Sequence, residues 1–262
     1  MQHIVDLDRY PLDQEGSPEW TALVAKSRSE LAAEGMFNLE GFLKPGMAAA
    51  AAAEVRPVMD AGSHEHRRSH NIYFKPDLPE LAPDHPALRK LETINHTVCA
   101  DQIPESIVLQ IYEYEPLIRF LAATMDKPQL HAMEDPLARA NVMSYRAGEA
   151  FFNDTATTEI YTTLLLQSPE QGGDFEYRTN LRSDDDPNYD GVARLLRGED
   201  PELRILKTQP GTLNVFRGKN TAHRVTTVAG DRDRMIAVFS YYERPGVLFS
   251  AEERLGFYGR AA

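Results

Sequence analysis

The sequence predicts an α+β fold that is mainly β, in which N-terminal helices support a double-stranded β-helix (jelly roll). Through roughly the first half of the chain, apolar residues recur at helical spacing. Beyond residue 140 the pattern changes to short strands separated by Gly, Pro and Asp turns. The chain has 262 residues, with no internal repeat and no Gly/Ser linker, so one domain over residues 1–262 is the simplest division. We expect its helical part over about 17–126 and its jelly-roll core over about 140–250.

The composition is that of an ordinary globular protein and disfavours nucleic acid or a membrane as a partner. The chain carries 28 Lys and Arg against 40 Asp and Glu, and its net charge of −12 opposes binding to polyanions. A single cysteine, Cys99, excludes an intrachain disulfide and a multi-cysteine metal cluster. The start of the chain lacks the apolar core of a signal peptide, and the alanine run 48–53 is too short to span a bilayer. We therefore expect a cytoplasmic protein.

Three helices are expected in the first half. Ser17 is suited to cap a helix and Pro18 to begin it, and apolar residues follow at helical spacing. An alanine-rich helix is expected over 47–59, and a third helix over 104–125, where apolar side chains share one face. Residues 61–86 are rich in proline and charge, so they are expected to form a loop.

The second half predicts short strands and one inserted helix. That helix is expected over 189–197, closed by Gly198. The strands are expected at 141–145, 161–167, 174–177, 203–206, 212–216, 222–228 and 234–242. Such a series, with turn residues between its members, is typical of an antiparallel sandwich or barrel.

Two polar residues on the last strands are predicted to point into the barrel. Side chains alternate along a strand, so His223 shares a face with Val225, and Arg234 shares a face with Ile236 and Val238. A buried arginine on an apolar face requires an anion. An inward His and an inward Arg on adjacent antiparallel strands can therefore bind a metal ion and a carboxylate, respectively.

This pattern resembles the C-terminal signature of the Fe(II)/2-oxoglutarate-dependent oxygenases, in which a metal-binding His is followed by an Arg on the next strand. The resemblance implies that His223 is an iron ligand and that Arg234 pairs with the distal carboxylate of 2-oxoglutarate. Arg232, in the preceding turn, is the alternative anchor. The segment that contains Asn141 and Tyr145 also matches the family, and the resemblance implies that both residues contact the cosubstrate.

One branch of the family is the most similar. The stretches 163–177 and 239–250 resemble bacterial halogenases and hydroxylases of free amino acids, and the resemblance as a whole covers roughly residues 30–262. It implies Fe(II) and 2-oxoglutarate as cofactors, and chloride if the chain is halogenase-like. We expect the substrate to be a small molecule, such as a free amino acid, that is hydroxylated or halogenated at an aliphatic C–H. Substrate contacts are expected from residues 64–75 and 214–220, at the mouth of the barrel.

The rest of the iron site departs from the family. The resemblance implies an H-x-D/E pair before the strand at 161–167, yet no histidine lies between His131 and His223. The expected His position falls on Asp154, and the expected carboxylate position falls on Ala156. A non-haem Fe(II) site normally presents two His and one carboxylate.

Three explanations stay open for this departure. In the first, the site is altered: Asp154 replaces the His, Glu159 is a further possible ligand, and chloride takes the position left open by Ala156. In the second, the chain is a catalytically impaired jelly roll that binds 2-oxoglutarate or another small ligand without turnover. In the third, which we favour, the segment 151–162 is not native, because it resembles a translated sequencing-adapter string. The natural gene would then carry an ordinary H-x-D or H-x-G motif here.

Overall fold

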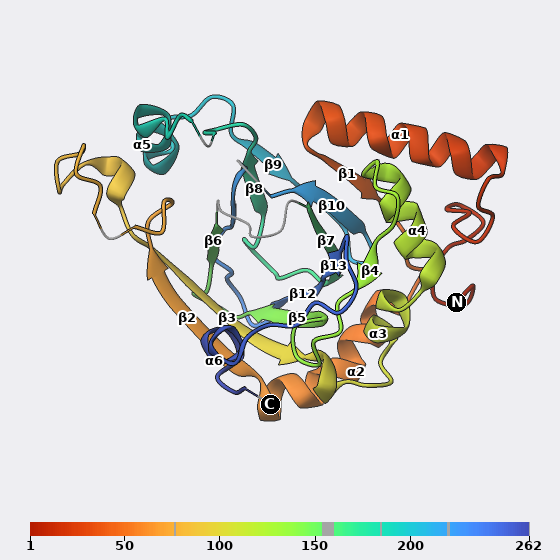
Figure 1. Cartoon of the computed structure of the whole chain (residues 1–262). Helices are drawn as coiled ribbons and strands as arrows, with labels where there is room; N and C mark the ends of the chain where they lie inside the picture. The colour runs from red at the N-terminus through yellow and green to blue at the C-terminus, as the bar shows by residue number, and fades with distance from the viewer. Residues whose placement is uncertain (76, 154–159, 184, 219–220, 262) are drawn as a thin grey trace.

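The computed structural model describes residues 1–75, 77–153, 160–183, 185–218 and 221–261, and two antiparallel sheets in it enclose a common interior (Figure 1). The strands of the major sheet are β1 (Met36–Leu39), β2 (His64–His70), β3 (Leu91–Cys99), β5 (Ala140–Tyr145), β7 (Ile160–Gln167), β10 (Leu213–Arg217) and β12 (Arg234–Phe239). Those of the minor sheet are β6 (Phe151–Asn153), β8 (Phe175–Arg178), β9 (Arg204–Leu206) and β11 (Ala222–Val225). A small ribbon joins β4 (His131–Ala132) to β13 (Tyr241–Tyr242).

The order of the strands is that of a double-stranded β-helix. Across the major sheet the order is β1–β10–β7–β12–β5–β3–β2, and across the minor sheet it is β6–β11–β8–β9. Strands that are distant in sequence therefore lie side by side: β12 pairs with both β5 and β7. The predicted α+β fold, mainly β, with a jelly roll supported by N-terminal helices, is confirmed.

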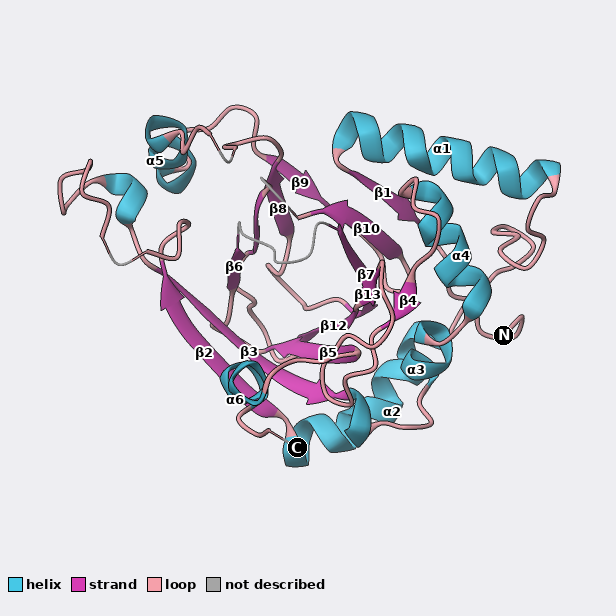
Figure 2. Cartoon of the chain, viewed as in Figure 1, coloured by secondary structure: helices cyan, strands magenta, loops and turns pink. Residues whose placement is uncertain are grey.

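Helices cover the outer face of the major sheet (Figure 2). The α-helices are α1 (Pro18–Glu34), α2 (Met47–Gly62), α3 (Ile107–Tyr112), α4 (Glu115–Thr124), α5 (Tyr189–Arg197) and α6 (Ala251–Tyr258), and short 3-10 turns are formed by η1 (Pro86–Leu88) and η2 (Ala100–Gln102). The first four of these α-helices pack with the sheet in one large apolar core. Of the helices that the structure describes, none has the length and apolar character needed to cross a membrane.

Each central strand of the major sheet has one face toward the helices and one toward the interior. On β12, Met235, Ala237 and Phe239 belong to the core under the helices, whereas Arg234 and the residues at alternate positions line an interior cavity. The same alternation runs along β5, β7 and β10, because successive side chains of a strand point to opposite faces. The fold thus separates a packing face from a cavity face.

Several predicted elements are confirmed in position. The Ser17 hydroxyl accepts a hydrogen bond from the Trp20 N–H at 3.1 Å and caps α1. Helix α2 begins at residue 47, as expected, and runs to Gly62. Helix α5 spans 189–197 and ends at Gly198, whose φ of 77° is the left-handed conformation that closes helices.

Two element predictions are wrong. The single helix expected over 104–125 is broken into α3 and α4, because Pro116 lacks an N–H to donate and stands in the first turn of α4. The loop expected over 61–86 contains the strand β2, which pairs with β3 over its whole length. Most side chains of this edge strand are exposed, so it carries none of the apolar alternation by which strands are recognised.

Candidate active site

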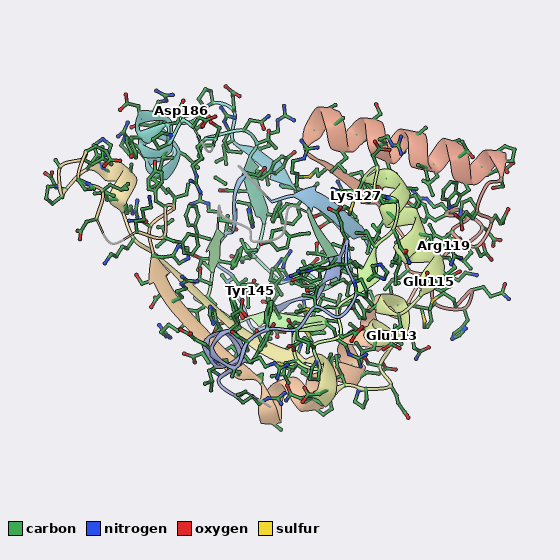
Figure 3. The ribbon with its side chains drawn as sticks, in the orientation of Figure 1. Glu113, Glu115, Arg119, Lys127, Tyr145 and Asp186 are labelled. Carbon is green, nitrogen blue, oxygen red and sulfur yellow. The ribbon has the colours of Figure 1, made fainter. Side chains whose placement is uncertain are left out.

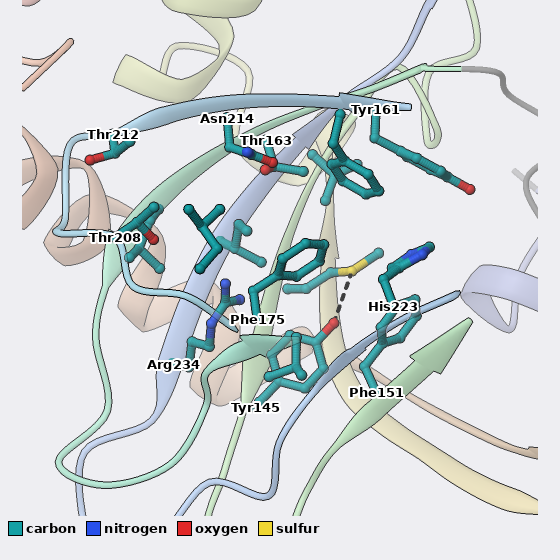
Figure 4. Close-up of a pocket in the computed structure, with 17 residues that line it drawn as sticks. Tyr145, Phe151, Tyr161, Thr163, Phe175, Thr208, Thr212, Asn214, His223 and Arg234 are labelled. Carbon is teal, nitrogen blue, oxygen red and sulfur yellow. Dashed lines mark hydrogen bonds between the residues drawn. The ribbon is translucent and has the colours of Figure 1, made fainter. Parts of the chain in front are cut away.

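A cavity of about 120 Å³ lies between the two sheets, and the predicted His and Arg both line it (Figure 4). Its walls are the interior faces of β5, β7, β10 and β12 on one side and residues of β6, β8 and β11 on the other. Figure 3 shows Tyr145 in this interior, whereas Glu113, Arg119 and Lys127 lie out with the helical layer. Among the described residues that line the cavity, Arg234 is the one charged side chain apart from the titratable His223.

His223 lines the cavity, and a backbone carbonyl holds one of its two ring nitrogens. Its side chain is buried on β11, and its Nδ1 lies 2.9 Å from the Thr221 carbonyl oxygen. That carbonyl can only accept a hydrogen bond, so Nδ1 carries the proton and Nε2 carries the lone pair that can bind a metal. Burial lowers the pKa of His223 to about 4, against the opposing effect of the Thr221 hydrogen bond, so the imidazole is neutral at pH 7.

Aromatic rings surround this imidazole. The ring centroids of Phe216, Phe151, Phe175 and Tyr161 lie 5.0, 5.7, 5.8 and 6.0 Å from that of His223. Burial raises the pKa of Tyr161 to about 12, so its hydroxyl stays protonated. Phe216 lies in the segment 214–220, from which substrate contacts were expected, whereas the other three rings were not predicted as site residues. The same inward alternation that identified His223 could have found Tyr161 on its strand.

Arg234 is a buried cation with an unused donor. Its side chain is 5% exposed, and its Nε donates to the Gly173 carbonyl oxygen at 3.1 Å. Its Nη1 is buried and has no hydrogen-bond partner within the described part of the chain. Burial lowers the pKa of Arg234, while Tyr145 and Asp174 act in the opposite direction. A guanidinium keeps its charge in proteins, so this unpaired N–H calls for an anion in the cavity.

The Gly172-Gly173 turn lets the minor sheet approach this arginine. Gly173 has a φ of +65°, and a Cβ there would lie 2.6 Å from Pro169 Cγ and 3.2 Å from Arg234 Cδ. A Cβ at Gly172 would lie 2.0 Å from the Thr227 carbonyl oxygen. Glycine is therefore required at both positions for the turn to reach the Arg234 side chain.

Of the remaining predicted contacts with the cosubstrate, Tyr145 lies in the cavity and two others do not. Tyr145 is the cross-strand partner of Arg234, and its ring centroid lies 5.9 Å from the guanidinium carbon. The alternative anchor, Arg232, is exposed and donates to the Ser168 and Pro169 carbonyl oxygens. Asn141 uses its amide on the Leu137 carbonyl and the Tyr258 hydroxyl. It does not line the cavity, so we do not assign it cosubstrate contact.

The described residues fit one ligand of an iron centre and the anchor of its cosubstrate. The lone pair on Nε2 of His223 is suited to a divalent metal, and the unpartnered Nη1 of Arg234 is suited to a carboxylate. Asp154, Ala156 and Glu159 lie outside the residues that the structure describes. Within those it does describe, no three His, Cys, Asp or Glu side chains form a metal-binding group.

Of the segments expected to contact substrate, one reaches the cavity. Asn214 and Phe216 line it, whereas the described residues between 64 and 75 do not. The reason is that β2 is the far edge of the major sheet, while β10 stands beside β7 near its centre.

Solved structures show what this fold resembles. An oxidoreductase of the 2OG-Fe(II) oxygenase family from Burkholderia pseudomallei is 12% identical, with a TM-score of 0.51 over 89% of this chain and 94% of that one. The epimerase SnoN, in complex with Fe3+, α-ketoglutarate and nogalamycin RO, is 12% identical, with a TM-score of 0.56 over 84% of each chain. HygX from Streptomyces hygroscopicus, with nickel and 2-oxoglutarate bound, is 14% identical, with a TM-score of 0.50 over 82% of this chain and 85% of that one.

Sequence comparison adds no relative to this set: no protein-family model matches the chain, and no curated protein does. At 12–14% identity the solved structures establish the architecture and leave the chemistry to the residues of this chain. This chain therefore has the fold of the 2-oxoglutarate- and Fe(II)-dependent oxygenases.

Proposed function

We propose that the cavity binds 2-oxoglutarate and Fe(II), and that the chain is built as an oxygenase for an aliphatic C–H of a small molecule. One observation carries the proposal. The same apolar cavity holds a neutral imidazole with an open Nε2 and a buried guanidinium with an unpartnered Nη1. A metal ligand and a carboxylate anchor together suit a 2-oxo acid that chelates a metal at one end and carries a carboxylate at the other.

In this proposal each described residue has a defined task. Arg234 binds the far carboxylate of 2-oxoglutarate and so orients the molecule toward His223. His223 ligates the metal through Nε2, with its ring held by the Thr221 carbonyl oxygen. Tyr145 keeps its proton, since burial raises its pKa to about 12, and it packs beside the guanidinium. The aromatic walls exclude water from the reacting groups. When bound, the metal and 2-oxoglutarate supply the oxidising chemistry.

The finer parts of the proposal come from the resemblance of the sequence. The substrate is proposed to be a free amino acid, and the outcome is hydroxylation or, with chloride beside Ala156, halogenation. The remaining iron ligands are proposed to come from the segment that contains Asp154. If that segment is not native, this exact chain is a binding protein with impaired turnover.

Anaerobic titration with Fe(II) and 2-oxoglutarate tests the proposal. Binding of both to one site gives a metal-to-ligand charge-transfer absorption band. We expect the double variant Asp154→His and Ala156→Asp to give the band, and the unaltered chain to give a weaker one or none. In that double variant, Arg234→Leu should abolish 2-oxoglutarate binding, because it removes the cation that meets the distal carboxylate.

The matched control is Arg232→Leu, which removes an exposed arginine two positions away and should leave the titration unchanged. No band in either the unaltered chain or the double variant contradicts the assignment to oxygenase chemistry. A band in the unaltered chain as strong as in the double variant supports the altered site over the non-native segment.

A further inference from the structure

We propose that Asp233, held by Arg56, is a positioning residue that sets the direction of Arg234 in the cavity. This inference rests on the proposed function, because it concerns how the same arginine meets the distal carboxylate of 2-oxoglutarate. It adds a network on the outer face of the sheet that neither the sequence pattern nor the cavity lining identified.

The Asp233 carboxylate is buried and fully engaged. It is 8% exposed, and Arg56 from helix α2 binds it in a bidentate manner, with Nη1 2.9 Å from Oδ2 and Nη2 2.7 Å from Oδ1. The Gln167 amide on β7 donates to Oδ1 at 2.7 Å and to the Asp233 carbonyl oxygen at 2.8 Å. The Ser144 hydroxyl on β5 donates to Oδ2. One carboxylate therefore ties together α2, β5 and β7 at the point where β12 begins.

This carboxylate lies one residue from the proposed anchor, on the opposite face of the strand. Arg234 and Tyr145 are cross-strand partners that face the cavity. Ser144 directly precedes Tyr145, just as Asp233 directly precedes Arg234. The Asp233–Ser144 contact therefore lies next to the Arg234–Tyr145 pair, on the opposite face of the sheet. It fixes the relative placement of the two strand ends that carry the inward residues.

Backbone pairing at the start of β12 is regular toward β5, where Arg234 pairs with Tyr145, and irregular toward β7. The ladder between β12 and β7 shifts register between Met235 and Ile236, just after Arg234. Before that shift, at Asp233, the Gln167 side-chain amide donates to the Asp233 carbonyl oxygen. In a regular ladder this carbonyl would accept from a backbone N–H of the neighbouring strand. Within the part of the chain that the structure describes, the Arg234 side chain has one hydrogen bond, from Nε to the Gly173 carbonyl oxygen. Its direction therefore depends on where the Asp233 network holds the strand.

A positioning role and a merely structural role make different predictions for two ligands. 2-Oxoglutarate has a distal carboxylate for Arg234, and 2-oxobutanoate lacks one. If Asp233 acts through Arg234, loss of its charge weakens 2-oxoglutarate and spares 2-oxobutanoate. If it only stabilises the fold, loss of its charge affects both ligands alike or neither.

The test is anaerobic calorimetric titration of the double variant Asp154→His and Ala156→Asp with each ligand in the presence of Fe(II), with every further substitution made in that background. We expect Asp233→Asn and Arg56→Gln each to weaken 2-oxoglutarate about tenfold, the effect typical of losing a partner that orients a ligand-binding group. The affinity for 2-oxobutanoate should change by less than about twofold. Arg56→Gln is the safer variant for folding, because the Arg56 side chain is 35% exposed.

Asp101→Asn is the matched control. It removes a bidentate Asp–Arg pair of similar geometry, with Asp101 accepting from Arg260 at 2.8 and 2.7 Å, away from the cavity. It should leave both affinities unchanged. Unchanged 2-oxoglutarate affinity in both network variants, or equal loss for both ligands, overturns this inference alone. No 2-oxoglutarate binding by either the unaltered chain or the double variant Asp154→His and Ala156→Asp overturns the proposed function, and the inference with it.

Discussion

At the scale of single residues, both groups proposed to hold ligands are oriented by a backbone carbonyl. The Thr221 carbonyl accepts from Nδ1 of His223, and the Gly173 carbonyl accepts from Nε of Arg234. In each case the hydrogen bond fixes one nitrogen of a side chain that lines the cavity. A side chain that is oriented before its ligand arrives loses less conformational entropy on binding.

Gly173→Ala should damage this arrangement directly. The new Cβ would meet Pro169 and the Arg234 side chain, and alanine disfavours the φ of +65°. We expect a loss of about 1–3 kcal/mol in the free energy of unfolding, from the left-handed conformation and the contact. Binding of 2-oxoglutarate should weaken as well, because the turn that carries the Gly173 carbonyl has to move. Chemical denaturation and calorimetry measure the two effects.

Gly246→Ala provides the comparison for that variant. Gly246 has a φ of +74° with nothing within 4 Å of the position of a Cβ, so it carries the backbone strain without the contact. Equal 2-oxoglutarate binding in the two glycine variants would contradict a role for the Gly173 turn in holding Arg234.

The sequence could predict a site residue where its position follows from local strand geometry, and could not where it follows from a tertiary contact. The inward direction of His223 and Arg234 follows from alternation along a strand, which is local. The sequence favoured Arg234 over Arg232 because Arg232 lies in the turn, and the structure places Arg232 at the surface, where it donates to the Ser168 and Pro169 carbonyl oxygens. The position of Asn141 could not be predicted, because its partner Tyr258 lies on the C-terminal helix α6, which was not expected from the sequence.

At the scale of elements, one buried carboxylate joins two segments that are distant in sequence. Asp135 is fully buried and accepts from the N–H groups of Leu137, Ala138 and Phe249 and from Nε of Arg254 on α6. Burial by itself raises the pKa of Asp135, but these hydrogen bonds outweigh it and hold the pKa below its ordinary value.

The stability of the chain should therefore depend on Asp135 in acid. Because the folded pKa is depressed, the contribution of Asp135 is complete above its unfolded pKa and is lost as the pH falls through the folded value. Asp135→Asn should cost about 2 kcal/mol at pH 7, the order expected for hydrogen bonds to a buried charge. Its loss of stability on acidification from pH 5 to pH 2 should be smaller than that of the unaltered chain. Urea unfolding across this range decides the point, and parallel pH profiles would count against it.

Helices and strands could be predicted where the residues that define them are neighbours in the sequence. The Ser17 cap and the Gly198 closure depend on neighbouring residues and were predicted correctly. The strand β2 was missed, because its pairing with β3 is a tertiary contact and its own residues alternate no apolar side chains. The helix broken at Pro116 could have been divided from the sequence, since proline in a helix interior removes a hydrogen bond.

At the scale of the whole molecule, the largest apolar cluster among the described residues lies between the helices and the major sheet. Phe120 on α4 and Phe37 on β1 are both almost fully buried, and their rings meet edge to face with centroids 6.1 Å apart. Phe120→Ala should lower the free energy of unfolding by about 3–5 kcal/mol through the cavity that it leaves. Leu248→Ala, at a side chain 56% exposed, should stay within about 0.5 kcal/mol.

Denaturant unfolding measures both variants, and titration of the folded protein with 2-oxoglutarate should give the same affinity for each. A change in affinity on Phe120→Ala would mean that the helical layer influences the cavity beyond the Arg56–Asp233 contact.

The separate packing and cavity faces of the major sheet determine which mutations such a chain can accumulate and still fold. Selection for a folded protein acts on the side chains of β12 that face the helices, which include Met235, Ala237 and Phe239. Selection for chemistry acts on the side chains of β12 that face the cavity, beginning with Arg234. A gene can therefore lose catalytic competence while its product still accumulates at normal levels. Expression yield and melting temperature report chiefly on the helix-facing residues, so a screen for lost activity in proteins of this architecture has to measure ligand binding.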